Sequence, residues 1–238
     1  MIKGILGKKI GMTQLFNNDG RALAVTVIEA GPCKILNIKT DEKDGYNAVQ
    51  LGFENKKPSN VTKPLLGVFK KFNCEPLRYI REFSVEKTDE IKSADSVTVE
   101  LFEVGEFVDI SATTIGKGFQ GGMKRWNWSG GPASHGSNCH RAPGSIGASS
   151  DPSRVYKGQH MPGQMGNIQQ TTQGLEIVDV DKENNLLLVK GAVPGKKGNF
   201  LVINKSFKRA KRDFEAEKKV VHKKSLNPLK QSKKSMKK

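Results

Sequence analysis

The middle of the chain, residues 113–172, restricts what the chain can fold into more than any other feature. These 60 residues include 12 glycines and 4 prolines, and no helical or strand periodicity runs through them. A compact domain rarely keeps such a long irregular connection unless it is functional or disordered. Phe119, Trp126, Trp128 and Tyr156 argue against a plain flexible linker, since such linkers are poor in aromatic residues. We therefore expect a loop without a stable shape of its own that becomes ordered on a partner.

The excess positive charge lies in two segments. The chain has 40 basic and 24 acidic residues, which gives a net charge of +16. Residues 113–172 carry six basic residues and one acid, and residues 204–238 carry fourteen basic residues and three acids. The remainder, residues 1–112 and 173–203, has 20 residues of each sign. A neutral body with two cationic extensions predicts a folded platform that places its extensions in a polyanion.

The sequence of the neutral body predicts a mainly β structure. It contains short runs rich in β-branched residues and bounded by turn residues, which predict strands at 22–30, 33–38, 49–53, 77–85, 97–101, 106–110, 175–180, 186–193 and 200–204. Many short strands at close spacing indicate a closed or nearly closed barrel. One helix is expected at 63–73, where four apolar residues fall at helical spacing. Residues 204–238 predict a short helix and then a Lys-rich tail, disordered until it meets an anion.

Several protein classes are already disfavoured. No apolar run approaches the roughly 18 residues that a membrane span needs. The start of the chain is interrupted by Gly4, Gly7, Lys8 and Lys9, unlike the apolar core of a signal peptide. Three cysteines cannot form a disulfide framework and are typical of a reducing compartment. We expect no cofactor, no metal and no membrane partner.

The middle stretch offers three kinds of contact to RNA. Basic side chains neutralise phosphates, glycine lets the backbone approach closely, and planar side chains pack on or stack with nucleotides. Phosphate contacts are expected from Lys117, Lys124, Arg125, Arg141, Arg154 and Lys157; close backbone approach at Gly116, Gly118, Gly121, Gly144 and Gly147; and packing or stacking from Trp126, Trp128, His135 and Tyr156. The two tryptophans could instead anchor the loop to the barrel.

Three enzyme-like patterns in the stretch are less favoured. His135, Cys139, His140 and His160 could suggest zinc, but they include one cysteine and no paired CxxC, so polar contacts to RNA are the better interpretation. The glycines of 116–122 lack the ending of a phosphate-binding loop and the helix start of a dinucleotide fingerprint. Ser145 sits in a GxSxG string without the strand and helix of a nucleophile elbow.

Specific blocks of the sequence resemble the bacterial-type form of the universal large-subunit ribosomal protein L-three family. The family signature fits Phe102, Asp109, Ala112, Thr114, Gly116-Lys117-Gly118, Gly121 and Arg125. Further family blocks match residues 7–13, 124–127, 135–136, 140–141, 143–147, 155–158, 163–167 and 186–195. The resemblance covers about residues 1–203. It brings Lys8, Lys9, His140 and Ser145 into the set of expected contacts with ribosomal RNA.

The resemblance implies a translation-factor-like β-barrel, formed by residues 1–112 and 173–203, with an inserted α+β subdomain at about 54–95. It implies a non-enzymatic structural constituent of the large subunit whose loop, 113–172, threads through ribosomal RNA toward the peptidyl-transferase centre. Binding near the 3′ end of that RNA, an early role in assembly and contacts with neighbouring ribosomal proteins are further expectations, as is a location in the cytoplasm or an organelle with bacterial-type ribosomes. The chain would not be a stand-alone homo-oligomer.

Two departures from the family are visible. Many bacterial members have a methylated glutamine where this chain has Ala148, so we expect that modification to be absent. Residues 204–238 exceed the usual bacterial end, and the family gives them no role.

Two other classes of function stay open on the sequence. A DNA-binding protein would share the charge, although no helix-turn-helix pattern is present. An enzyme could use the loop as an active-site lid, in which case replacing Ser145, His135 and His160 would abolish turnover.

Overall fold

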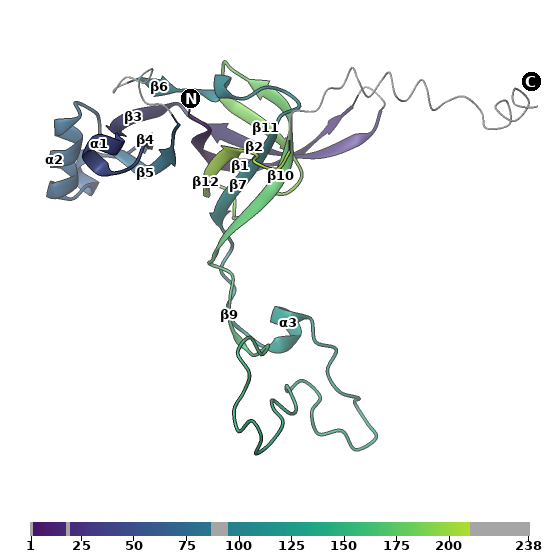
Figure 1. Ribbon diagram of the computed structural model, residues 1–238. Coiled ribbons are helices and arrows are strands. Elements are labelled where there is room, and N and C mark those ends of the chain that lie inside the picture. The colour runs from purple at the N-terminus through teal and green to yellow at the C-terminus, as the bar shows by residue number, and fades with distance from the viewer. Residues whose placement is uncertain (1, 18–19, 87–94, 210–238) are drawn as a thin grey trace, which may run out of the picture. The chain divides into compact units, whose positions relative to one another are not determined.

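The computed structural model describes residues 2–17, 20–86 and 95–209 (Figure 1). Contacts divide the chain into two compact units. One is formed by the residues up to Ala112 together with those from Thr171 onward, and the other is Thr113–Gln170.

Six strands of the first unit close into a barrel. Its order is β1 (Gly4–Phe16), β12 (Phe200–Lys205), β7 (Phe107–Thr113), β10 (Gln169–Asp181), β11 (Leu186–Lys190) and β2 (Ala22–Ala30), which returns to β1. The strands β1, β12, β7 and β10, β11, β2 pair with their neighbours in antiparallel fashion, with Ile5 opposite Ile203 and Leu187 opposite Ile28. A closed barrel has no free strand edges, which are otherwise sites of unwanted pairing.

A second, four-stranded sheet has the order β5 (Leu77–Ser84), β4 (Ala48–Asn55), β3 (Cys33–Lys39) and β6 (Ser96–Val97). A short helix, α1 (Asp41–Asp44), joins β3 to β4, and α2 (Lys63–Lys71) lies between β4 and β5 in the chain. A small cluster of Leu36, Phe69 and Leu77 seats α2 on the sheet. Gly52 is required there, since a Cβ at this position would lie 2.2 Å from the Leu77 side chain.

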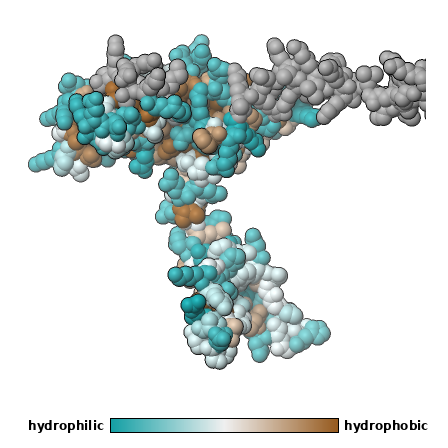
Figure 2. Space-filling model, in the orientation of Figure 1, coloured by the Kyte–Doolittle hydropathy of each residue, from teal (hydrophilic) through white to brown (hydrophobic). Residues whose placement is uncertain are grey.

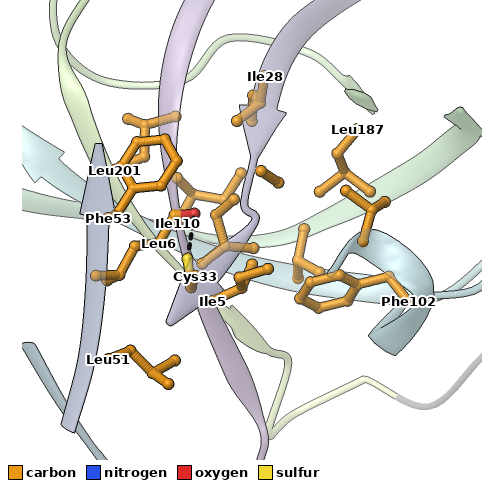
Figure 3. Close-up of a cluster of buried hydrophobic side chains, with 14 of the residues drawn as sticks. Ile5, Leu6, Ile28, Cys33, Leu51, Phe53, Phe102, Ile110, Leu187 and Leu201 are labelled. Atoms are coloured by element: carbon orange, nitrogen blue, oxygen red, sulfur yellow. Dashed lines mark hydrogen bonds between the residues drawn. The ribbon is translucent and has the colours of Figure 1, made fainter. Parts of the chain in front are cut away.

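One hydrophobic core serves both sheets of the first unit (Figure 3). Ile5, Ile28 and Leu201 from the barrel belong to the same buried cluster as Leu51 and Phe53 from β4. Successive residues of a strand point to opposite faces, and both faces are covered where β1 and β4 meet the core, because residues 4–7 and 51–53 are buried without a break. The cluster also encloses Cys33, whose thiol donates a hydrogen bond to the Leu6 carbonyl over 3.4 Å.

The prediction of a mainly β protein with a barrel is confirmed, and so is a helix within 63–73. The expected strand at 97–101 is wrong. β6 ends at Val97, and Val99–Leu101 forms a single 3₁₀ turn. The Phe102 amide donates to the Val99 carbonyl over 3.0 Å, which allows both apolar side chains to be buried.

Other differences concern boundaries. β1 was not expected, because Gly4, Gly7 and Gly11 interrupt its apolar pattern. The four-stranded sheet includes β3 and β4, which begin before residue 54, the expected start of the insert. The helix and tail expected within 204–238 lie, from residue 210 onward, outside the described residues.

Candidate nucleic-acid interface

The unit Thr113–Gln170 begins and ends as a narrow two-stranded ladder. β8 (Gly118–Gln120) pairs with β9 (Gly163–Met165) in antiparallel fashion, and the Lys117 amide donates to the Met165 carbonyl over 2.8 Å. Gly166, at a φ of +71°, permits this ladder, because a Cβ there would lie 2.0 Å from the Ile115 carbonyl oxygen. The expectation of a stretch without any regular structure is therefore wrong at its two ends.

Trp126 connects two distant segments of this unit. It ends the short helix α3 (Gly122–Trp126) and stacks on His160, with ring centroids 3.9 Å apart. The Trp126 indole N–H and the Arg125 guanidinium both donate to the Met161 carbonyl, over 2.9 and 2.8 Å. We call Arg125, Trp126, His160 and Met161 the Trp126 clip. It joins two segments that are more than 30 residues apart in the sequence.

Trp128 packs inside the same unit. Asn127 adopts a left-handed conformation after α3, with a φ of +57°. The Trp128 ring then covers Gly122, where a Cβ would lie 1.9 Å from the indole. Both tryptophans pack within Thr113–Gln170, an arrangement that neither interpretation described. Trp126 is 37% exposed, which leaves an edge of its ring accessible. Contact of the tryptophans with RNA stays a prediction.

A cavity of about 750 Å³ opens beside Trp128. Its walls include the segment Gly130–Gly131, held against residues 139–140 by hydrogen bonds from the Gly131 amide to the carbonyls of Cys139 and His140. The His140 ring contacts the Pro132 carbonyl over 2.8 Å. No acidic residue lines the cavity, which is bordered by Met123, Asn127, Trp128, Ser129, Cys139, Arg141, Pro143, Gln159 and His160 among others.

The cations of this unit face solvent. Lys117, Lys124, Arg141, Arg154 and Lys157 are exposed. None of these five forms an ion pair within the described chain, because Asp151 is the single acid of the unit. Arg125 differs, since it is half-buried in the Trp126 clip and lies 4.9 Å from the Trp126 ring. The unit therefore presents an uncompensated positive surface.

The remaining expected contacts are spread over the same unit. A Cβ at Gly118, Gly121 or Gly144 would meet nothing within 4 Å, so the backbone is accessible there. Space is tighter at Gly116 and Gly147, with neighbours at 3.4 and 3.7 Å. His135 is exposed, and Tyr156 is 59% exposed.

Phe119 was not among the expected contacts, although it is 76% exposed on β8. Its signal in the sequence was present, as an aromatic residue between glycines in an acid-free stretch. In the space-filling view, residues 113–170 carry mostly hydrophilic and near-neutral surface (Figure 2).

Lys8 and Lys9 lie apart from these residues, on β1 of the first unit. Lys8 forms an ion pair with Glu54 over 2.8 Å, and this hydrogen bond raises the pKa of the lysine. The Lys9 side chain is buried and donates to the carbonyls of Val193 and Gly195, over 2.6 and 3.1 Å. Burial lowers the pKa of Lys9. Lys9 thus has a structural role at the barrel, and its contact with RNA stays a prediction.

The structure gives the enzyme-like patterns no support in the described residues. No group of three or more potential metal ligands gathers there. The Ser145 hydroxyl donates to the Gly147 carbonyl over 3.0 Å, and neither a strand nor a helix flanks it. No helix in the described part of the chain combines the length and apolar character needed to cross a bilayer.

Comparisons with known proteins identify relatives along most of the chain. A family model described as "Ribosomal protein L3" matches residues 80–186. Proteins named "Large ribosomal subunit protein uL3" are 54% identical in Pelobacter propionicus and 56% identical in Syntrophotalea carbinolica, over 87% of this chain and 100% of each relative. The protein of that name from Thermotoga petrophila is 53% identical over 85% of this chain and 96% of its own length.

Proposed function

The chain belongs to the ribosomal protein L3 family, and on that basis we propose that it is a structural, non-enzymatic constituent of the large ribosomal subunit that binds ribosomal RNA directly. Its place is then within the ribosome. Bacterial relatives favour the cytoplasm, and an organelle with bacterial-type ribosomes would offer the same RNA.

The observation that carries RNA binding is the charge of Thr113–Gln170. Six basic residues stand against one acid, and five of the six are exposed without an ion pair in the described chain. Such a surface releases counterions when phosphates replace them, which favours binding at physiological salt. The accessible backbone at Gly118, Gly121 and Gly144 supports close approach of phosphates to N–H groups.

The internal contacts of the unit suggest how it would meet RNA. The Trp126 clip and the β8–β9 ladder hold the two chain segments together, so only the residues between them need to adapt to the RNA. Less conformational entropy is then lost on binding than for a loop without any internal contact. The longer irregular part, about residues 129–158, would gain most of its order on the RNA.

The finer parts of the proposal rest on the family. We place the Thr113–Gln170 unit in ribosomal RNA on the side of the peptidyl-transferase centre. The binding region lies near the 3′ end of the large-subunit RNA, and binding occurs early in assembly. Neighbouring large-subunit proteins complete the surroundings, with no membrane partner and no stand-alone homo-oligomer.

Salt dependence of RNA binding tests the proposal. Replacing Arg141 and Arg154 by Gln should lower the slope of log K against log salt by about 1.5 units, since each lost phosphate contact removes roughly 0.7 to 0.9. The matched control replaces Arg78 and Lys190 by Gln, because both pair with glutamates in the first unit. The RNA is a transcript of the 3′-terminal region of a bacterial large-subunit RNA. Equal slopes for the two variants would contradict contact by this unit.

A further inference from the structure

The segment from Lys56 to Cys74 forms a second positive surface, in the first unit. It contains five lysines and no acidic residue. All five lysines are exposed, and none forms an ion pair or a side-chain hydrogen bond in the described chain. Five other lysines of this unit do have a carboxylate partner, among them Lys3 with Glu86 and Lys190 with Glu176. The positive charge around α2 is therefore locally uncompensated.

Helix geometry gathers three of these lysines on one side. At about 100° per residue, Lys63, Gly67, Lys70 and Lys71 fall within an arc of roughly 100°. We call these four residues the α2 lysine face. The opposite side of the helix carries Phe69, which is buried against Leu36 and Leu77. Because that side seats α2 on the sheet, the lysine face must point to solvent. Hydrophilic surface covers much of this region in the space-filling view (Figure 2).

Gly67 provides independent support for a partner on the α2 lysine face. It lies in the interior of a nine-residue helix, where glycine is less favourable than alanine. A Cβ at this position would meet nothing within 4 Å, so no packing inside the protein requires the glycine. A missing side chain between Lys63 and Lys70 does leave the helix backbone open to close approach from outside. The glycine thus fits a partner that lies directly on the lysine face.

We propose that the α2 lysine face binds the phosphate backbone of a double-helical RNA segment, as a contact surface additional to Thr113–Gln170. The face bears no aromatic residue that could stack on unpaired bases, and lysines act on phosphates as point charges. Its lysines span about 12 Å along the helix axis, at about 1.5 Å per residue. Val68, which is 40% exposed, borders the face at about 60° from Lys71 around the helix, whereas Leu65 lies on the opposite side near Phe69, so the centre of the face is polar. The inference rests on the proposed function, because it assumes that the partner is ribosomal RNA.

Removing the charge is the first test. In the full chain, the triple variant K63Q, K70Q and K71Q should lower the salt slope of binding to the 3′-terminal transcript by about two units. The matched control, K3Q, K43Q and K190Q, removes the same charge from lysines near carboxylates. A general effect of net charge would lower both slopes equally and would overturn the proposal, whereas a loss confined to the first variant supports it.

Filling the face is the second test. Gly67→Gln replaces glycine by a better helix former in open space, so the melting temperature should rise. If RNA lies on this face, the same variant should bind the transcript several-fold more weakly. A stabilised variant with wild-type RNA affinity would overturn the proposal. So would a triple variant that binds RNA normally but loses a neighbouring ribosomal protein, because the face would then be a protein contact.

The same binding measurements distinguish failure of the α2 contact from failure of the proposed function. Wild-type protein without measurable affinity for the transcript would overturn both. If R141Q with R154Q flattens the salt dependence while K63Q, K70Q and K71Q does not, binding by Thr113–Gln170 stands and the α2 contact alone is refuted.

Discussion

The imidazole of His160 lies flat against the indole of Trp126, with 3.9 Å between the ring centroids and 4° between the planes. The same indole donates to the carbonyl of the next residue, Met161. A stack and a hydrogen bond thus fix one tryptophan to two consecutive residues that are far from it in sequence. This arrangement gives the Thr113–Gln170 unit internal order of its own.

Replacing His160 by Ala should loosen the Trp126 clip without affecting the barrel. An aromatic pair contributes about 0.5–1.5 kcal/mol beyond its buried area, so local opening of α3 should become easier by about that amount. Hydrogen exchange followed by mass spectrometry should show faster exchange in 121–127 and 159–163. The control His135→Asn keeps an exposed residue that tolerates the positive φ of 60°. Unchanged exchange in His160→Ala would mean that the stack does not hold the unit.

Two neighbouring glycines offer a matched pair of substitutions. Gly122→Ala would place a Cβ 1.9 Å from the Trp128 ring, whereas the Cβ of Gly121→Ala would meet nothing within 4 Å. Overpacking of this kind costs about 1–3 kcal/mol, so we expect Gly122→Ala to displace Trp128. Near-ultraviolet circular dichroism of the tryptophans and limited proteolysis should change in Gly122→Ala alone. If Gly121→Ala is equally disruptive, the close packing of Trp128 on Gly122 is not the cause.

A substitution at Gly121 tests RNA binding without disturbing the packing of the free protein. If its backbone meets a phosphate, Gly121→Ala should weaken RNA binding while the free protein keeps its stability. Wild-type affinity of this variant would remove Gly121 from the expected contacts.

The barrel was predictable because its strands follow local rules. β2 and β12 are β-branched runs between turn residues, and both appear within one residue of the expected bounds. β1 was not predicted, because glycines interrupt its apolar pattern. Gly7 is one of them, and a Cβ there would lie 2.8 Å from the Glu29 carbonyl oxygen. Close packing against distant residues, which periodicity cannot reveal, requires glycine at both Gly4 and Gly7.

The candidate site was predictable in composition but not in contacts. Acid depletion and glycine content predict that Thr113–Gln170 is a surface for a polyanion; Arg141 and Lys157 are exposed there, and their contact with RNA stays a prediction. The Trp126–His160 stack could not be foreseen, because it joins residues across an irregular segment with no period. For the same reason Arg125 was assigned to phosphate alone, although its guanidinium also closes the clip.

Lys9 should matter to the stability of the barrel more than Lys8 does. Lys9→Met leaves the carbonyls of Val193 and Gly195 without this donor, at a cost of about 1–3 kcal/mol per buried group. Lys8→Met breaks a partly exposed ion pair with Glu54 and should cost less than about 1 kcal/mol. Urea denaturation of the two variants gives the comparison. If Lys9→Met lowers the free energy of unfolding less than Lys8→Met does, then removing a buried charge offsets most of what the two lost hydrogen bonds cost.

Lys9 should also leave a signature in alkaline solution. Burial lowers its pKa in the folded protein below the usual 10.5, so the unfolded chain holds more protons between these two values. The free energy of unfolding contributed by this residue therefore rises with pH in that window. The difference between wild type and Lys9→Met should grow as the pH increases toward 10.5. A difference that is constant or shrinks would contradict the lowered pKa.

Cys33 should give the opposite dependence on pH. Burial raises the pKa of its thiol from 9.0 to about 12, and the hydrogen bond to Leu6 does not offset this. Below about pH 8, one unit under the unfolded pKa, the thiol is protonated in both states and its contribution to stability is constant. Between there and about 12 the unfolded thiol loses its proton first, so stability falls by up to about 1.4 kcal/mol per pH unit. The difference in unfolding free energy between wild type and Cys33→Ala should be flat up to about pH 8 and decline above it. Cys139→Ala is the matched control, because it removes an exposed thiol in place of a buried one. A difference that stays flat to pH 11 would show that the folded protein ionises Cys33 as readily as the unfolded chain does.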